Sequence, residues 1–281
     1  MSVIQIGLVD TTGQLDEDLV RTAAAALNIQ VIRDVPQFWP VQGTVIYLPD
    51  MRKIPSGVWP VQLVSHLPPN KGGFHRTTHH EPYAKVLATT QNDGWTIAAS
   101  HEVVEMLVDP YGSRLQNSTA IEIIKEEVRD RPGQFAYLVE ACDPCEADTF
   151  AYDIQGIAVS DFVTPNYYDP VATPGVRYSF TGAITEPRQV LPGGYVSWID
   201  EEKEECQQLR YLDAAPQIFH LGSPKDNLSL REWVDAQMSG SKLQTTRHIS
   251  AAPRNHTLLQ RCRAHRNELH RIATARAKLF K

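Results

Sequence analysis

Apolar and polar positions in the first third of the chain follow two different periods. Residues 3–9 are mostly apolar and run into Asp10-Thr11-Thr12-Gly13, which predicts a strand that ends in a turn. Residues 15–27 carry apolar side chains at helical spacing, and the acidic residues 16–18 favour a helix N-terminus there. Further strands are expected at 29–32, 43–48 and 61–67. The chain therefore begins as a mixture of strands and helix.

A second helix is expected after a polar, glycine-containing stretch. This stretch, residues 69–80, predicts a loop that leads into a strand at 83–89. Residues 95–108 contain no Gly or Pro and place apolar side chains on one helical face. Asp109-Pro110 is expected to end this helix, because proline disfavours a helical conformation of the residue before it.

The rest of the chain predicts two more helices, a turn-rich β region and a basic tail. A helix is expected at 119–129, a strand at 135–141, and short strands between prolines at 152–159, 176–180 and 195–199. Residues 228–238 predict a short helix with Ser229 as its N-cap. A Ser-Gly-Ser linker follows, and leucines among arginines predict a basic amphipathic helix at 255–281.

The elements and the charge together divide the chain into a main domain at residues 1–238 and a linker with a basic C-terminal helix at residues 239–281. The net charge is −6, but residues 242–281 contain ten Lys or Arg and one acidic residue. This tail carries +9, so residues 1–241 carry −15 and should repel nucleic acid. Phe280 is the one aromatic residue of the tail, so base stacking is limited. We expect the basic helix to dock on a protein partner or a larger assembly, and we do not expect nucleic-acid binding.

Composition places the chain among soluble globular proteins. Its 281 residues are 42% hydrophobic, which is ordinary for a protein with a sizeable core. Residues 1–13 show neither a basic stretch nor the long apolar run of a secretory signal or membrane helix. Four cysteines are few for a disulfide framework and favour a reducing compartment. We therefore expect a cytoplasmic protein, or part of a particle assembled in the cytoplasm, with no membrane partner.

Two of the cysteines form a short motif, Cys142-Asp143-Pro144-Cys145. This spacing occurs in half of a zinc ribbon or in a redox loop. The sequence has no second CxxC pair, and a tight turn around Pro144 explains the pattern as well. A structural role is the default interpretation.

The residues that point to chemistry are Ser100-His101-Glu102-Val103-Val104-Glu105, inside the helix expected at 95–108. Residues four apart lie on one helical face, so His101 and Glu105 can reach one metal ion. Glu102 lies one step around the helix, where a carboxylate can take a proton from metal-bound water. The competing interpretation is a chance match in a solvated amphipathic helix, because short motifs arise at random.

Through this HExxE segment and the order of strand, turn and helix around it, residues 83–146 resemble the zincin metallopeptidases. The resemblance implies an α+β fold: a zincin-like mixed sheet with an active-site helix, followed here by the turn-rich β region and the basic helix. It also implies zinc, held by His101 and Glu105, with Glu102 as general base. The chain departs from the family at Glu105, where a second histidine is usual. A carboxylate there adds negative charge, which weakens acidification of the bound water and makes manganese or iron more acceptable.

A zincin site requires a third protein ligand from further along the chain. Glu140 and Asp143 are the first candidates, because they lie in or just after the strand expected at 135–141. Glu140 would otherwise interrupt an apolar strand, which costs free energy. The remaining candidates are Asp109, Glu146, Asp161, His75, His79 and His80.

Two functions are compatible with these features. The first is a metal-dependent hydrolase, a metallopeptidase in which Glu102 activates the water and the strand at 83–89 pairs with a peptide or protein substrate. The second is a non-catalytic structural or assembly protein, of a virion or another large particle, on a zincin-like scaffold.

Overall fold

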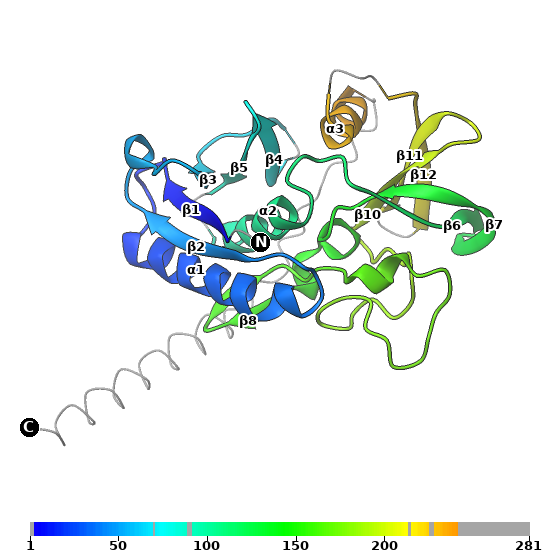
Figure 1. The fold of residues 1–281 in the computed structure, drawn as a ribbon, viewed down its shortest axis with the longest axis horizontal. Helices are drawn as coiled ribbons and strands as arrows, with labels where there is room; N and C mark the ends of the chain where they lie inside the picture. Colours follow the sequence, from blue (N-terminus) through cyan, green and yellow to red (C-terminus); the bar gives the residue numbers. More distant parts are fainter. Residues whose placement is uncertain (1–2, 70, 89–91, 213–214, 225–227, 241–281) are drawn as a thin grey trace, which may run out of the picture.

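Two five-stranded sheets, with the helices α1, α2 and α3 around them, form the body of this computed structural model (Figure 1). The structure describes residues 3–69, 71–88, 92–212, 215–224 and 228–240. The basic helix expected at 255–281 lies outside these residues. An α+β fold with mixed sheets, which the sequence predicts, is confirmed at this level.

The first sheet has the strand order β2-β1-β3-β5-β4. Strand β4 (Gly73–Thr78) runs antiparallel along one edge. The four parallel strands are β1 (Ile4–Asp10), β2 (Gly43–Leu48), β3 (Val58–Val64) and β5 (Glu81–Leu87).

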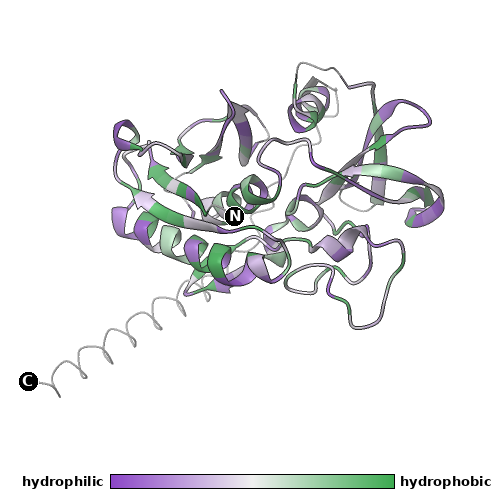
Figure 2. Ribbon diagram, in the orientation of Figure 1, coloured by the Kyte–Doolittle hydropathy of each residue, from purple (hydrophilic) through white to green (hydrophobic). Residues whose placement is uncertain are grey.

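One face of the first sheet is covered by two helices, α1 (Glu17–Ile29) and α2 (Trp95–Val108). Leu27 of α1 and Met106 of α2 share a hydrophobic core with Ile6 and Val61 of the sheet. Figure 2 shows the resulting pattern, with a hydrophobic β1 and an α1 whose surface alternates between hydrophobic and hydrophilic residues. The helix predicted at 95–108 is confirmed with the same bounds.

The polar stretch 69–80 contains strand β4, so the prediction of a loop there is wrong. His79 and His80 form the two-residue turn between β4 and β5, with φ of 49° and 66°. Two positive φ values occur in the type I′ turns that match the twist of a hairpin. Strand β5 lies between β3 and β4, so both of its edges are already paired. It therefore cannot pair with a substrate, as residues 83–89 were expected to do, and β4 has the edge position instead.

The second sheet is antiparallel with the order β12-β11-β10-β7-β6. Its strands are β6 (Leu115–Ile124), β7 (Glu127–Leu138), β10 (Tyr195–Asp200), β11 (Glu205–Leu212) and β12 (Ala215–Gly222). Strand β10 confirms the strand predicted at 195–199, whereas the sequence pattern did not predict β11 and β12.

The prediction of a helix at 119–129 is wrong, because this segment forms the hairpin of β6 and β7. Lys125 and Glu126 form its turn with φ of 51° and 67°. The β-branched residues Ile121, Ile123 and Val128 favour strands. In so short a segment, the spacing of apolar residues fits a helix and a strand equally well.

Four other predicted strands differ from the structure. Residues 29–32 continue α1 into a π-helical turn, Gln30–Asp34, in which Val31 is buried. Residues 152–159 form two short strands, β8 (Tyr152–Ile154) and β9 (Ile157–Val159), and residues 176–180 contribute only an isolated bridge at Ser179. The strand predicted at 135–141 ends at Leu138, so Glu140 lies beyond it.

Helix α3 (Leu230–Gly240) packs beside the second sheet, where Trp233 and Val234 contact a small core with Leu138. Ser229 caps it as predicted: the Glu232 N–H donates to Ser229 Oγ, and the Ser229 N–H donates to the Glu232 carboxylate, each at 3.2 Å. Within the described part of the chain, no helix has the length and apolar character needed to cross a bilayer.

Candidate metal centre

Helix α2 lies between two hydrophobic cores and is buried along most of its length. Val103 and Met106 belong to the core of the first sheet, and Val104 and Val108 belong to the core beneath the second sheet. The polar residues of α2 are therefore buried as well: the exposed fractions of His101, Glu102 and Glu105 are 8%, 3% and 0%. Buried ionisable groups require partners, and these partners define the site.

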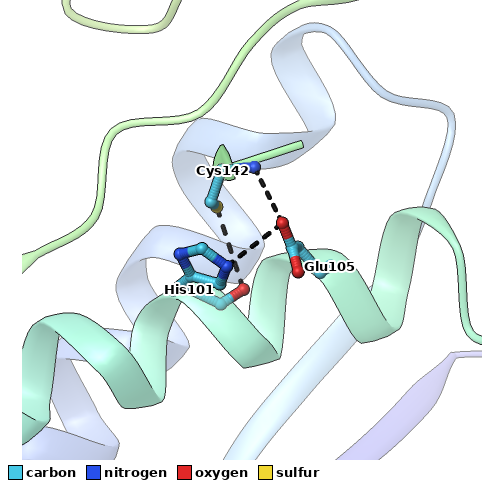
Figure 3. Close-up of side chains that lie close together, drawn as sticks. All are labelled: His101, Glu105 and Cys142. Carbon is cyan, nitrogen blue, oxygen red and sulfur yellow. Dashed lines mark hydrogen bonds and ion pairs between the residues drawn. The ribbon is translucent and has the colours of Figure 1, made fainter. Parts of the chain in front are cut away.

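His101 faces two carboxylates from different parts of the chain. Its Nε2 atom lies 3.2 Å from Glu105 Oε1, one turn further along α2, and 3.2 Å from Asp143 Oδ1. Asp143 begins a short 3-10 turn, Asp143–Cys145, that follows β7 and the Glu140 segment. The backbone N–H of Cys142 donates to Glu105 Oε1 at 3.1 Å and holds that carboxylate in place (Figure 3).

His101 belongs to two groups of possible ligands whose atoms lie within 4.8 Å of one another, one with Glu105 and Cys142 and one with Asp143 and Glu146. In a tetrahedral zinc site, bonds of 2.0–2.1 Å place the ligand atoms about 3.3 Å apart, close to both separations from His101. Asp143 Oδ1 is buried, and His101 Nε2 is its ion-pair partner. The donor set of one imidazole and two carboxylates suits zinc, and its hard oxygens also suit manganese or iron.

The pKa values show how strongly the carboxylates act on His101. Burial alone would lower the pKa of His101, but Glu105 and Asp143 outweigh burial and raise it well above 6.5. Burial would raise the pKa of Glu105, but His101 and Arg231 reverse the shift and lower it. Burial and the charge of Glu105 raise the pKa of Asp143 well above 3.8. The raised pKa values favour the protonated forms of His101 and Asp143, and a bound cation would displace these protons.

Glu140, the other predicted ligand, lies on the opposite side of the same carboxylates. Its Oε2 atom forms an ion pair with Arg231 of α3, and its Oε1 atom has no hydrogen-bond partner in the part of the chain that the structure describes. Glu140, Glu105 and Asp143 each bring one oxygen within 4.8 Å of the others. The structure therefore places Asp143 beside His101 and places Glu140 on the far side of the carboxylate pair.

Arg231 is the residue of this cluster that the sequence did not indicate. Its Nη1 atom lies 3.0 Å from Glu105 Oε2 and 3.8 Å from Asp143 Oδ2. A single arginine in a short amphipathic helix carries no distinctive motif. The sequence offers one weak indication that Arg231 is buried: it lies between the apolar residues Leu230 and Trp233, which are buried in the structure.

Glu102 points away from His101, toward strand β4. His75 Nδ1 lies 3.2 Å from Glu102 Oε2, and His75 Nε2 lies 3.3 Å from the carbonyl oxygen of Asp109. A Cβ atom on Gly73 would lie 2.7 Å from Glu102 Oε1, so this glycine leaves the space that the carboxylate occupies. Glu102 is thus held between two residues of β4, close to Glu105, with which it and His75 form a second group of potential ligands.

The remaining candidates have other positions. Asp109 ends α2 and accepts from the Arg114 N–H, and Asp161 accepts from the N–H groups of Phe162 and Thr181. Both therefore have structural partners. Glu146 lies near His101 and Asp143, whereas His79 and His80 are exposed at the β4–β5 turn.

The two cysteines of the CxxC motif flank the centre. Cys142 and Cys145 are buried free thiols, and the Cys145 N–H donates to the Cys142 carbonyl in the turn around Pro144. Burial raises the pKa of the Cys142 thiol well above its ordinary value, and the charge of Glu105 adds to this shift. Cys142 also belongs to a group of possible ligands with His101 and Glu105, and the turn around Pro144 holds it there (Figure 3).

Comparisons with protein-family models, with curated proteins and with solved structures each found no match. The chemistry of this chain is therefore inferred from the geometry of the centre.

Proposed function

We propose that this protein is a metal-dependent hydrolase of the zincin type, a zinc metallopeptidase in which His101, Glu105 and Asp143 hold the ion. One observation carries the proposal: the 3.2 Å separations of His101 Nε2 from Glu105 Oε1 and from Asp143 Oδ1. The contact with Asp143 adds a residue from a second segment of the chain to the pair that the short motif supplies. Of the two first candidates, Glu140 and Asp143, we prefer Asp143 as the third ligand because it contacts His101.

The bound ion would polarise a substrate carbonyl and lower the pKa of its water. His101 supplies a neutral nitrogen once its proton is displaced, and the Cys142 N–H keeps Glu105 Oε1 directed at the centre. In this proposal Glu102, whose carboxylate lies beside His75, would accept and return the proton of the attacking water. His75 and Gly73 set the position of its carboxylate.

The arrangement of the first sheet supports a peptide-like substrate. Strand β4 forms an edge of the sheet, and its His75 contacts Glu102 of α2. An edge strand offers unpaired backbone groups to which an extended peptide can add. In this proposal β4 takes the part that the sequence suggested for residues 83–89.

A second candidate function is a metal-holding scaffold without turnover, a structural or assembly protein. The low exposure of the centre favours it: the side chains of His101, Glu102 and Asp143 are 10%, 4% and 2% exposed. A substrate requires access to the ion and to Glu102, whereas a structural ion does not. In this candidate, the basic tail outside the described residues docks on the partner.

Metal analysis and peptide hydrolysis by the full chain separate these functions. Purified protein would be assayed for stoichiometric zinc and for cleavage of a mixed peptide library, alongside Glu102→Gln and the exposed control Glu186→Gln. Hydrolysis that falls by about 100- to 10,000-fold in Glu102→Gln, with zinc retained, supports the peptidase. Zinc without hydrolysis supports the scaffold, and a protein that binds no metal contradicts both.

A further inference from the structure

Helix α3 places a buried cation behind the proposed zinc ligands. The side chain of Arg231 is 7% exposed, and the neighbouring side chains of Glu105, Glu140 and Asp143 are at most 5% exposed. An arginine buried among carboxylates keeps its charge, and here Glu105 and Asp235 outweigh burial and raise its pKa. Three carboxylates in so buried a place would be strongly unfavourable without such a partner.

The two oxygens of each proposed carboxylate ligand face different partners. Glu105 Oε1 and Asp143 Oδ1 lie 3.2 Å from His101, whereas Glu105 Oε2 and Asp143 Oδ2 lie 3.0 and 3.8 Å from Arg231 Nη1. His101 and Arg231 therefore contact different oxygens of the same two carboxylates. An ion beside His101 would leave the contacts with Arg231 in place.

We propose that Arg231 is a positioning residue of the metal centre: its guanidinium holds the outer oxygens of Glu105, Asp143 and Glu140, so that the inner oxygens of Glu105 and Asp143 face His101. This inference rests on the proposed function. It makes α3 part of the centre, although the zincin resemblance ends at residue 146. The ligands alone carry two carboxylates, and Arg231 offsets the negative charge that Glu105 adds where a histidine is usual.

The backbone of α3 is anchored so that Arg231 keeps this position. The Arg231 N–H donates to the Gly112 carbonyl at 2.9 Å, and the Leu230 N–H donates to Ser113 Oγ at 3.2 Å. Gly112 has a φ of +60°, and a Cβ atom there would lie 2.9 Å from the Cβ of Arg231. The loop after α2, which contains Gly112 and Ser113, thus holds the first turn of α3 close to α2.

Two ion pairs anchor the outer side of α3. Lys71 pairs with Asp235, and Arg76 Nε lies 3.6 Å from Glu232 Oε1. Because Arg76 belongs to β4 and Lys71 precedes it, the helix is held to the same edge strand that carries His75. The position of Arg231 is therefore specified from the α2 loop and from the first sheet.

The test compares Arg231→Met and Arg231→Lys with Val234→Ala in the full chain. Val234 packs in the small core of α3 with Leu138 and Cys206, so its truncation weakens the helix without touching the carboxylates. Zinc affinity would be measured by isothermal titration, and the visible spectrum of added cobalt would report the arrangement of the ligands. Thermal unfolding would show that each variant folds.

Arg231→Met should weaken zinc binding by about 10- to 100-fold and alter the cobalt spectrum, as loss of a residue that orients ligands does. Arg231→Lys keeps the charge but not the position of Nη1, the atom that contacts all three carboxylates, so its affinity should be intermediate. If Arg231→Met does not fold, Arg231→Lys tests the role by itself. Val234→Ala should keep wild-type affinity and spectrum at a lower melting temperature.

Wild-type affinity and spectrum in the folded Arg231 variants would overturn the positioning role. Equal weakening in Val234→Ala would also overturn it, because general destabilisation would then explain the loss. Zinc binding by the wild type without hydrolysis contradicts the proposed peptidase but leaves this test intact. A wild type that binds no zinc contradicts the metal centre itself and this role with it.

Discussion

The Nε2 atom of His101 lies 3.2 Å from Oδ1 of Asp143, although the two residues come from a helix of the first sheet and from a turn beyond the second sheet's β7. The contact joins the two halves of the fold at one buried point. It also links the HExxE motif to Asp143 of the CxxC motif, one of the two third-ligand candidates that the sequence indicated. The proposed metal centre therefore depends on both halves of the fold.

Asp143→Asn should weaken zinc binding by more than about 100-fold, because the amide replaces a charged ligand and loses more than an orienting contact would. Isothermal titration with zinc measures this change. Glu140→Gln should have a smaller effect, since Glu140 contacts Arg231 and not His101. A larger loss in Glu140→Gln than in Asp143→Asn would reverse our choice of third ligand.

Gly73→Ala should reduce peptide hydrolysis by about 10- to 100-fold, because the new Cβ atom displaces the Glu102 carboxylate from its position. Zinc affinity should stay within about twofold, since Glu102 is not among the proposed ligands. Gly72→Ala is the matched control, because a Cβ atom there meets nothing within 4 Å. Equal activity of the two variants would show that Glu102 does not need this position.

Zinc affinity should continue to rise with pH above 6.5, the ordinary pKa of histidine. The raised pKa values of His101 and Asp143 mean that both groups hold protons, and zinc must displace them. Each displaced proton strengthens binding by up to about tenfold per pH unit below the pKa of its group. Titrations from about pH 6 to about pH 9 would measure the slope, and an affinity that levels off near pH 6.5 would contradict the raised pKa of His101.

Metal-free protein should lose stability as the pH rises. A group whose folded-state pKa is raised stabilises the fold below its unfolded pKa and loses this contribution as the pH passes the folded value. For His101 the loss begins near pH 6.5 and extends upward, and for Asp143 it begins near pH 3.8. Melting temperatures in a chelator should therefore fall above pH 6.5, and saturating zinc should oppose the fall. A melting temperature in chelator that rises over this range would contradict the assignment.

Replacing Lys125-Glu126 by Asn-Gly should stabilise the protein by about 1–2 kcal/mol. Both residues have positive φ, which Asn and Gly adopt at lower free-energy cost. If residues 119–129 formed the helix suggested by the sequence pattern, glycine there would instead destabilise by about 1 kcal/mol. Urea unfolding of the variant distinguishes the hairpin from the helix by the sign of the change.

The local pattern of apolar and polar residues was sufficient to predict secondary structure where a segment matched one type of element over its whole length. Residues 95–108 carry no helix breaker and form α2 with the predicted bounds. Pattern failed in the hairpins, because polar turns such as His79-His80 and Lys125-Glu126 lack the glycine or asparagine that marks a tight turn. It also failed at residues 29–32, where α1 continues instead of giving way to a strand.

The sequence by itself determined the mixed α+β class, helix α2, and the placement of His101 and Glu105 one turn apart, because each depends on spacing between near neighbours. Tertiary structure alone decided that Asp143 faces His101, that His75 holds Glu102, and that Arg231 lies behind the carboxylates. These residues are brought together by the packing of two sheets and α3 against α2. Contacts across long stretches of chain leave no periodicity in the sequence, so no local pattern records them.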